Sequence, residues 1–417
     1  MSGTLTPEEA LLQATARDFA TREVAPGATE RDETERYDRS LFEQMGALGL
    51  TAAPFPESVG GAGFSYLGWS LVMEELGAVD MAMAVSLSVH ILSQYPVVTW
   101  GTPEQHARWL PPMLVGEALG AFALTEPHAG SDAAAIRTRA DRVGPADAPE
   151  AYALTGTKVW ISNAPEADRY LVFATLDPTA GPAAITAFLV EKGTPGFRFG
   201  AHERKMGIRA CPAAELLFEH AEVPAANRLG AEGEGYKIAL SALGEGRISI
   251  AAGCVGIARA ALDQGLECLT IYAFSSENWN RPQDEVSGLM DLLAMAIGRE
   301  VPQLKQDGVR LFFVGDRQGL SEKIRLSLEQ AELATAGNSR LVLNVCFNYG
   351  GRWDIVQAVA KLAAEGRDAT EANLSGAMAL SHTPDPDLVI RTGNEQRDAS
   401  AECHRPRSSG TRHVGHR

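Results

Sequence analysis

The pattern of apolar residues changes near residues 262–265, and this change constrains the folds open to the whole chain. Before it, residues 1–115 read as helices, and from about residue 122 short β-rich runs alternate with turn residues, as in a small sheet or barrel. After it, continuous apolar strands alternate with helices, which is typical of a parallel α/β sheet. The sequence therefore predicts a multidomain protein in which α+β domains precede an α/β domain.

The N-terminal region carries clear helix signals. Thr6 suits the N-cap of a helix, Pro7 suits its first position, and the two acidic residues that follow suit the exposed amides there. Apolar residues at helical spacing come next, at Leu12, Ala16, Phe19 and Ala20. A long apolar stretch from Tyr66 to Val98 predicts two buried helices.

Composition narrows the class of protein. A formal net charge of −16 over 417 residues argues against a general binder of nucleic acids or anionic membranes. The N-terminus lacks a signal pattern, and no apolar run reaches the about 18 residues that a membrane span needs. The cysteines form no CxxC pair: Cys211, Cys254, Cys268, Cys346 and Cys403. We therefore expect a cytoplasmic protein without a transmembrane segment or a cysteine metal site.

Four motifs in the first part of the chain occur in a fixed order. They are "FALTEPHAGSD", "KVWISNA", "RKMGIRACPAAELLFEHAEVP" and "LGAEGEGYKIALSALGEGRISIAAGCVGIARAALD". Together they resemble the acyl-CoA dehydrogenase family, from about residue 5 to residue 264. The resemblance implies a helical domain over residues 1–120 and a β domain over residues 121–230, followed at 231–264 by the start of a truncated C-terminal helical domain.

The same resemblance implies sites for FAD and for acyl-CoA. It assigns the FAD to Phe122, Ala123, Leu124, Thr125, Glu126, Pro127, His128, Ala129, Gly130, Ser131, Trp160, Ile161 and Ser162. It assigns the acyl-CoA to Ser131, Gly244, Glu245, Gly246 and Arg247. The residue types suit a flavin, because hydroxyl groups can donate to its ring and an aromatic side chain can form a wall beside it. Small residues at 129 and 130 would let the backbone approach it closely.

A simpler interpretation of either flavin motif is a turn between two strands with a core tryptophan. That interpretation is favoured for one motif alone. Four motifs in the family's order and spacing favour the cofactor site instead.

The catalytic base is the missing element. Dehydrogenation of an acyl-CoA needs a carboxylate that removes the α-proton. In most members of the family, as the resemblance implies, this carboxylate lies in the C-terminal helical domain. That domain also closes over the flavin and contributes to the oligomer. This chain departs from the family after Leu262. Other members carry the base just before the arginine that matches Arg247, where this chain has Gly246. Glu245 is a doubtful substitute, because one step along a helix turns a side chain by about 100°.

Three later motifs resemble a second family. "LTIYAFSSENWNRP", "FNYGGRWDIVQA" and "PDLVIRTGNEQR" resemble the cis-prenyltransferases, which include undecaprenyl diphosphate synthases, and imply an incomplete parallel α/β sheet over residues 265–397. By this resemblance the allylic substrate is bordered by Ser275, Ser276, Glu277 and Trp279, and Asn278 assists proton removal. The diphosphate of isopentenyl diphosphate is assigned to Arg281, Arg391 and Arg397, whose guanidinium groups suit it. The alternative, that these arginines only flank strand ends, is disfavoured by three matching motifs.

This second site also lacks its centre. The family's catalytic aspartate and phosphate loop precede these motifs, and nothing like "DGNGRW" occurs in the chain, so the ligands for Mg²⁺ are missing. Residues 398–417 are rich in Arg, His and Ser and are expected to be disordered. Their abrupt start inside a motif is typical of a shifted reading frame. His404, His413 and His416 could form a metal tract, but a disordered tail is the favoured interpretation.

Three functional hypotheses follow. The leading one is an FAD-dependent acyl-CoA dehydrogenase-like oxidoreductase, impaired by its missing base, with an electron-transfer flavoprotein as the partner that the resemblance implies. The second is an incomplete prenyltransferase for isopentenyl and allylic diphosphates. The third is a non-catalytic flavin- or CoA-binding fusion product. A gene-level join of two incomplete enzymes is favoured over an evolved bifunctional enzyme.

Overall fold

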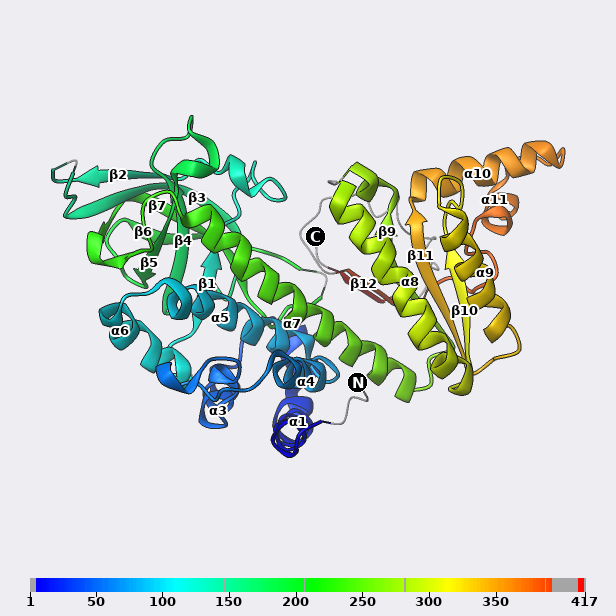
Figure 1. Cartoon of the computed structure of the whole chain (residues 1–417), viewed down its shortest axis with the longest axis horizontal. Helices are drawn as coiled ribbons and strands as arrows, with labels where there is room; N and C mark the ends of the chain where they lie inside the picture. Colours follow the sequence, from blue (N-terminus) through cyan, green and yellow to red (C-terminus); the bar gives the residue numbers. More distant parts are fainter. Residues whose placement is uncertain are drawn as a thin grey trace. The chain divides into compact units, whose positions relative to one another are not determined.

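The computed structural model describes residues 5–145, 147–205, 207–280, 283–386, 388–391 and 412–415. The chain forms two compact units, mainly Met1–Ala260 and Ala261–Gly415 (Figure 1). We call them unit 1 and unit 2.

Unit 1 begins with helices that start where the sequence signals predict. Thr6 and Glu9 form a capping box, in which the Thr6 hydroxyl accepts from the Glu9 N–H and the Glu9 carboxylate accepts from the Thr6 N–H, both at 3.1 Å. The predicted pair of buried helices is also confirmed over residues 66–100. The helices are α1 (Pro7–Phe19), α2 (Ala28–Glu33), α3 (Arg39–Ala47), α4 (Tyr66–Gly77), α5 (Met81–Trp100), α6 (Pro103–Leu114) and α7 (Gly235–Asp263).

The β part of unit 1 is one eight-stranded sheet. Its order is β6-β7-β3-β2-β4-β5-β8, and β1 pairs in parallel with β4. The strands are β1 (Gly120–Ala123), β2 (Arg139–Val143), β3 (Ala151–Ser162), β4 (Arg169–Thr175), β5 (Ile185–Glu191), β6 (Phe197–His202), β7 (Ala213–Pro224) and β8 (Arg228–Leu229). One apolar core runs through the helices and this sheet.

A buried carboxylate holds α7 against the N-terminal helices. Glu75, on α4, has a side chain only 4% exposed and accepts from Arg17 of α1 at 2.7 Å and from Arg259 of α7 at 2.9 Å. Burial acts to raise the pKa of Glu75, but the two arginines outweigh it and lower the pKa. Close by, a Cβ on Gly77 would lie 2.5 Å from the carbonyl oxygen of Gly253, so the backbones of α4 and α7 touch at a glycine crossing.

Two helices, Met81–Trp100 and Gly235–Asp263, are long and apolar enough to cross a membrane by length and composition alone. Of the apolar window of Met81–Trp100, 72% is buried inside the protein, against 28% for Gly235–Asp263. Core helices of soluble proteins pass the same test.

Unit 2 contains a three-stranded parallel sheet in the order β10-β11-β9. Helices α8 and α9 cover one face through a core that includes Phe274, Phe313, Ile324 and Phe347. The elements are β9 (Cys268–Ser275), α8 (Gln283–Gln306), β10 (Val309–Val314), α9 (Glu322–Thr335), β11 (Leu341–Tyr349), α10 (Gly351–Ala364), α11 (Glu371–Ala377), β12 (Leu388–Arg391) and β13 (Arg412–Gly415). The predicted class, α+β followed by an incomplete parallel α/β sheet, is confirmed.

Strand β12 covers Leu388–Arg391 of the predicted "DLVIR" strand, and Asp387 lies outside the described residues. β12 pairs with β13 rather than with the three-stranded sheet. Apart from β13, the tail over residues 398–417 lies outside the described residues.

Candidate functional site

The first two motifs lie side by side in unit 1. The chain leaves β1 at Ala123, and the Thr125 carbonyl accepts from the Val159 N–H of β3 at 3.0 Å. Lys158 reaches across from β3 and donates to the Leu124 carbonyl at 3.0 Å. Segments about thirty-five residues apart in sequence therefore lie next to each other, as a shared site requires.

A buried ion pair fixes this surface. Lys158 Nζ lies 2.7 Å from Glu126 Oε1, and the two side chains are 0% and 2% exposed. Glu126 also accepts from the N–H groups of Arg137 at 2.6 Å and Thr138 at 2.9 Å. Burial lowers the pKa of Lys158 to about 8, and it acts to raise that of Glu126, but Lys158 outweighs it there and the pKa of Glu126 is lowered. Glu126 is among the residues that the resemblance assigns to the FAD, and its carboxylate holds the loop through Lys158 and two backbone N–H groups.

The loop after Glu126 is open to solvent. Glu126 and Ala129 exchange two backbone hydrogen bonds of 3.0 Å, which close a tight turn. A Cβ added to Gly130 would meet nothing within 4 Å. Ala129 is buried, whereas the exposed residues of the loop are Pro127, His128, Gly130 and Ser131.

Trp160 stands at a break in the sheet. The pairing of β3 with β7 shifts register between Lys158 and Ile161, and Trp160 has a φ of 58°, which a bulky residue rarely adopts. Bulges of this kind redirect a side chain and concentrate near active sites. Ile161 is buried, while Trp160 is half-buried.

Three hydrogen-bond donors on this surface have no partner among the described residues. They are the Thr125 hydroxyl, the Trp160 indole N–H and the Ser162 hydroxyl, all on half-buried side chains. Half-buried donors without protein partners are what a polar planar ligand needs on the face it lies against.

Asn163 is a positioning residue to which sequence reasoning gave no role. Its φ is 64°, and its buried amide donates to the carbonyls of Ser86 at 2.9 Å and Gly120 at 3.1 Å. It therefore ties the end of β3 to α5 and to β1. An asparagine directly after a strand, inside the quoted "ISNA", was the available signal, because asparagine tolerates this backbone region.

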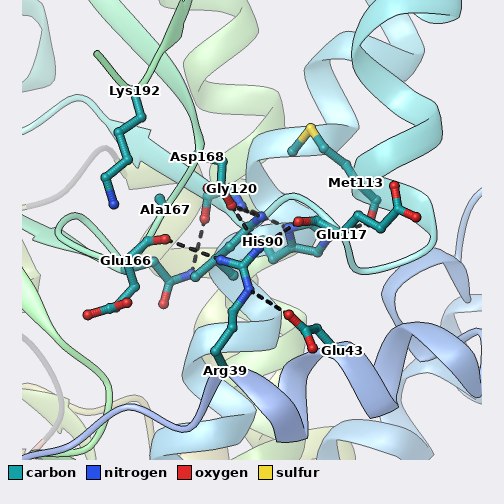
Figure 2. Close-up of polar contacts among 12 residues, drawn as sticks. Arg39, Glu43, His90, Met113, Glu117, Gly120, Glu166, Ala167, Asp168 and Lys192 are labelled. Carbon is teal, nitrogen blue, oxygen red and sulfur yellow. Dashed lines mark hydrogen bonds and ion pairs between the residues drawn. The ribbon is translucent and has the colours of Figure 1, made fainter.

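A second polar cluster anchors the start of β1 (Figure 2). Arg39 of α3 lies 2.8 Å from Asp168, which also accepts from the Leu119 N–H at 2.8 Å. The Gly120 N–H donates to His90 Nδ1 at 3.0 Å, so His90 is neutral and its Nε2 donates to the Met113 carbonyl at 3.0 Å. The helices thereby fix the strand that leads into the first motif.

The stability of unit 1 is expected to fall in acid because of His90. Complete burial lowers its pKa from 6.5 to about 3. Below pH 6.5, His90 takes up a proton in the unfolded chain but not in the folded one. The free energy of unfolding therefore decreases as pH falls from 6.5 towards 3, by at most about 1.4 kcal/mol per pH unit. Urea unfolding against pH should show this loss in the wild type but less of it in His90→Gln, which can keep both hydrogen bonds. Parallel pH profiles would contradict the assignment.

The predicted acyl-CoA residues on α7 divide between two faces. Gly244 and Arg247 are exposed. The Glu245 carboxylate lies beside Tyr66 of α4, where one of its oxygens is buried without a hydrogen-bond partner. Burial, and then the hydrogen bond to Glu245, raises the pKa of Tyr66. A Cβ on Gly246 would lie 3.2 Å from Leu92 of α5, so the Glu245–Gly246 side of the helix faces α4 and α5.

In unit 2 the ends of the three parallel strands meet at one edge. Asn278 follows β9, and its side-chain oxygen accepts from the Ser275 N–H at 2.8 Å. The Trp279 indole donates to the Asn348 side chain at 2.8 Å, and Asn348 donates to the Asp316 carbonyl at 2.7 Å. Ligands of open α/β sheets bind outside the carboxyl ends of the strands. Asn348, with a φ of 54°, and Asp316 were missed by sequence reasoning, although Asn348 lies in the quoted "FNYGG".

The remaining prenyl-site residues are placed only in part. Ser276 lies against Gly350, where an added Cβ would be 2.6 Å from its hydroxyl oxygen, and Glu277 is exposed. Arg281 and Arg397 lie outside the described residues, and Arg391 lies in β12 with its side chain undescribed. Within the described part of the chain, no group of three or more His, Cys, Asp or Glu side chains could hold a metal ion.

Three family models match the chain. The models "Acyl-CoA dehydrogenase, N-terminal domain" and "Acyl-CoA dehydrogenase, middle domain" match residues 6–117 and 121–221. The model "Putative undecaprenyl diphosphate synthase" matches residues 245–400.

Similar proteins come from the first of these families. An acyl-CoA dehydrogenase of Bacillus subtilis is 40% identical over 291 residues, which cover 70% of this chain and 74% of the relative. The structure of butyryl-CoA dehydrogenase from Megasphaera elsdenii has a TM-score of 0.62 at 36% identity, over 74% of this chain and 82% of that one. A chain of the solved structure "Electron transferring flavoprotein of Acidaminococcus fermentans" also has a TM-score of 0.62 at 36% identity, over 81% and 83%. The chain therefore belongs to the acyl-CoA dehydrogenase family, and its C-terminal part adds a prenyltransferase domain of the undecaprenyl diphosphate synthase type.

Proposed function

We propose that unit 1 binds FAD and acyl-CoA as a dehydrogenase-like oxidoreductase whose proton-abstraction step is impaired. The observation that carries the proposal is that Thr125 is hydrogen-bonded to Val159 of β3, the strand that carries Trp160 and Ser162. Thr125, Trp160 and Ser162 are all half-buried donors without a partner among the described residues. A flavin bound there would supply a hydride acceptor. The open loop at Gly130 leaves room for its approach.

The chain's own residues would orient the cofactor rather than complete the reaction. Trp160 would form the wall beside the flavin ring, and the hydroxyls of Thr125 and Ser162 would donate to it. Glu245 is the carboxylate on α7 next to Gly246, the position at which some members of the family carry the catalytic base. Its position beside Tyr66, on the side of the helix that faces α4 and α5, supports the proposal that it does not serve.

The remaining parts of the proposal rest on the relatives. An acyl-CoA substrate is proposed from the names of the similar proteins, and an electron-transfer flavoprotein as redox partner from the Acidaminococcus neighbour. We also propose that the protein is cytoplasmic and oligomeric.

A second candidate function, prenyl transfer, is favoured by one observation only. Asn278 and Trp279 lie with Asn348 where the strands of the unit 2 sheet end. We propose that this unit is catalytically silent, because its motifs lack the aspartate and phosphate loop that would hold magnesium and the allylic diphosphate.

Flavin binding by the full-length protein tests the leading proposal. After FAD is added and free flavin removed by gel filtration, the wild type should retain flavin. Trp160→Ala should bind it about tenfold more weakly, since an aromatic contact contributes about 0.5–1.5 kcal/mol beyond burial. Trp279→Ala, which removes a tryptophan 38% exposed in unit 2, should bind flavin like the wild type. A wild type that retains none would contradict the proposal.

A further inference from the structure

The segment between β6 and β7 is held in an unfavourable conformation. Ile208 has a φ of 51°, a left-handed region that a β-branched side chain almost never adopts. It is only 8% exposed, and Cys211 is 1% exposed, so the turn over residues 207–211 is packed and not a loose surface loop. Strain of this kind persists only where surrounding contacts enforce it, and it concentrates at functional sites.

Two side chains supply those contacts. Asp32 of α2 accepts from the N–H of Arg209 at 2.8 Å and from its Nε at 2.9 Å, and Lys205 holds the turn from within. Its ammonium donates to the Ile208 carbonyl at 2.7 Å and to the Cys211 carbonyl, at the two ends of the strained turn.

No carboxylate lies within ion-pair distance of the Lys205 ammonium among the residues the structure describes. Burial lowers the pKa of this ammonium, while the carboxylates of Asp32, Glu35 and Glu203 act on it in the opposite direction from beyond ion-pair distance. Its hydrogen bonds go to the backbone, where they close the turn.

The turn leads directly into the partner of the Trp160–Ser162 segment. The Pro212 carbonyl accepts from the Asn163 N–H at 2.8 Å. Ala213 and Ala214 then pair with Ser162 and Ile161 in the sheet. The position of the chain at residue 212 therefore sets where β3 ends.

We propose that Lys205 is a positioning residue for the flavin wall: by closing the turn at Ile208 it fixes residues 212–214 and, through them, Trp160–Ser162. This rests on the proposed function of unit 1. Without the ammonium, the Cys211 carbonyl loses its donor and the Ile208 carbonyl keeps only the Cys211 N–H, at 3.1 Å. The turn then relaxes, and the donors at Trp160 and Ser162 leave the geometry that a flavin needs.

Substitution of Lys205 tests this in the full-length protein, with Lys192 as a matched control. Lys192 also donates from its ammonium to a backbone carbonyl, that of Pro165 at 2.7 Å, but on the surface. Lys205→Met should weaken FAD binding about tenfold or more and shift the visible absorption of the bound flavin, whereas Lys192→Met should do neither. Lys205→Arg, which can still donate, should recover part of the affinity.

A second readout needs no flavin. In the FAD-free protein, Lys205→Met should speed amide hydrogen exchange in peptides covering Trp160–Asn163, because the bond from Asn163 to Pro212 loosens. Unchanged exchange there overturns the inference, as does unchanged FAD affinity and spectrum where the wild type binds FAD, even if the melting temperature falls. If the wild type binds no FAD, the proposed function of unit 1 fails, and the exchange experiment alone decides the role of Lys205.

Discussion

The full-length protein is expected to form no elongated product from farnesyl diphosphate, isopentenyl diphosphate and magnesium. Prenyl transfer needs a metal to hold the diphosphate leaving group, and the chain lacks the aspartate and phosphate loop that bind it in the family it resembles. The described residues likewise contain no cluster of metal ligands. We expect no incorporation of label from isopentenyl diphosphate into extractable lipid.

The control is Asn278→Ala, at the position that the resemblance assigns to proton removal. It should be indistinguishable from the wild type, because there is no activity to lose. A complete cis-prenyltransferase in the same assay verifies the reagents. Chain elongation by the wild type that Asn278→Ala reduces would contradict the account and show that this half is functional.

Turnover of acyl-CoA by the FAD-loaded protein is expected to lie about 10²–10⁴-fold below that of a complete acyl-CoA dehydrogenase. That is the contribution of a positioned general base. Glu245 lies beside Tyr66 on the side of α7 that faces α4 and α5, so its carboxylate is not expected to replace the missing one. Reduction of an electron-accepting dye, with acyl-CoAs of several chain lengths, measures the rate.

Glu245→Gln serves as the matched variant for this prediction. The substitution keeps the shape of the side chain and removes its ability to take a proton, so the low rate should not change. Robust wild-type turnover that this substitution abolishes would show that Glu245 is the base.

Local features of the fold could be predicted because they depend on neighbouring residues. The capping box of α1 needs only Thr6 and Glu9, three positions apart. The switch from the helical and β domains to alternating strands and helices depends on the period of the apolar residues, and the structure has it where the pattern changes. The three parallel strands of unit 2 follow from continuous apolar runs between helices.

Long-range contacts could not be predicted in this way. Arg259 binds Glu75 across 184 residues, and Asn163 binds Ser86 across 77. No local pattern distinguishes these polar side chains from exposed ones. The same limit applies to the ion pair of Glu126 with Lys158, which lie 32 residues apart and for which the sequence offered no local signal.

Anaerobic reduction of the bound flavin by acyl-CoA tests the central claim most directly, namely that unit 1 retains a flavin site without a working base. The FAD-loaded protein is mixed with butyryl-CoA without oxygen or dye, and the flavin absorbance is followed, with dithionite added last. The account predicts that butyryl-CoA leaves the flavin oxidised over a time in which a complete dehydrogenase is reduced, while dithionite bleaches it at once. Rapid bleaching by butyryl-CoA, lost in Glu245→Gln, would contradict it.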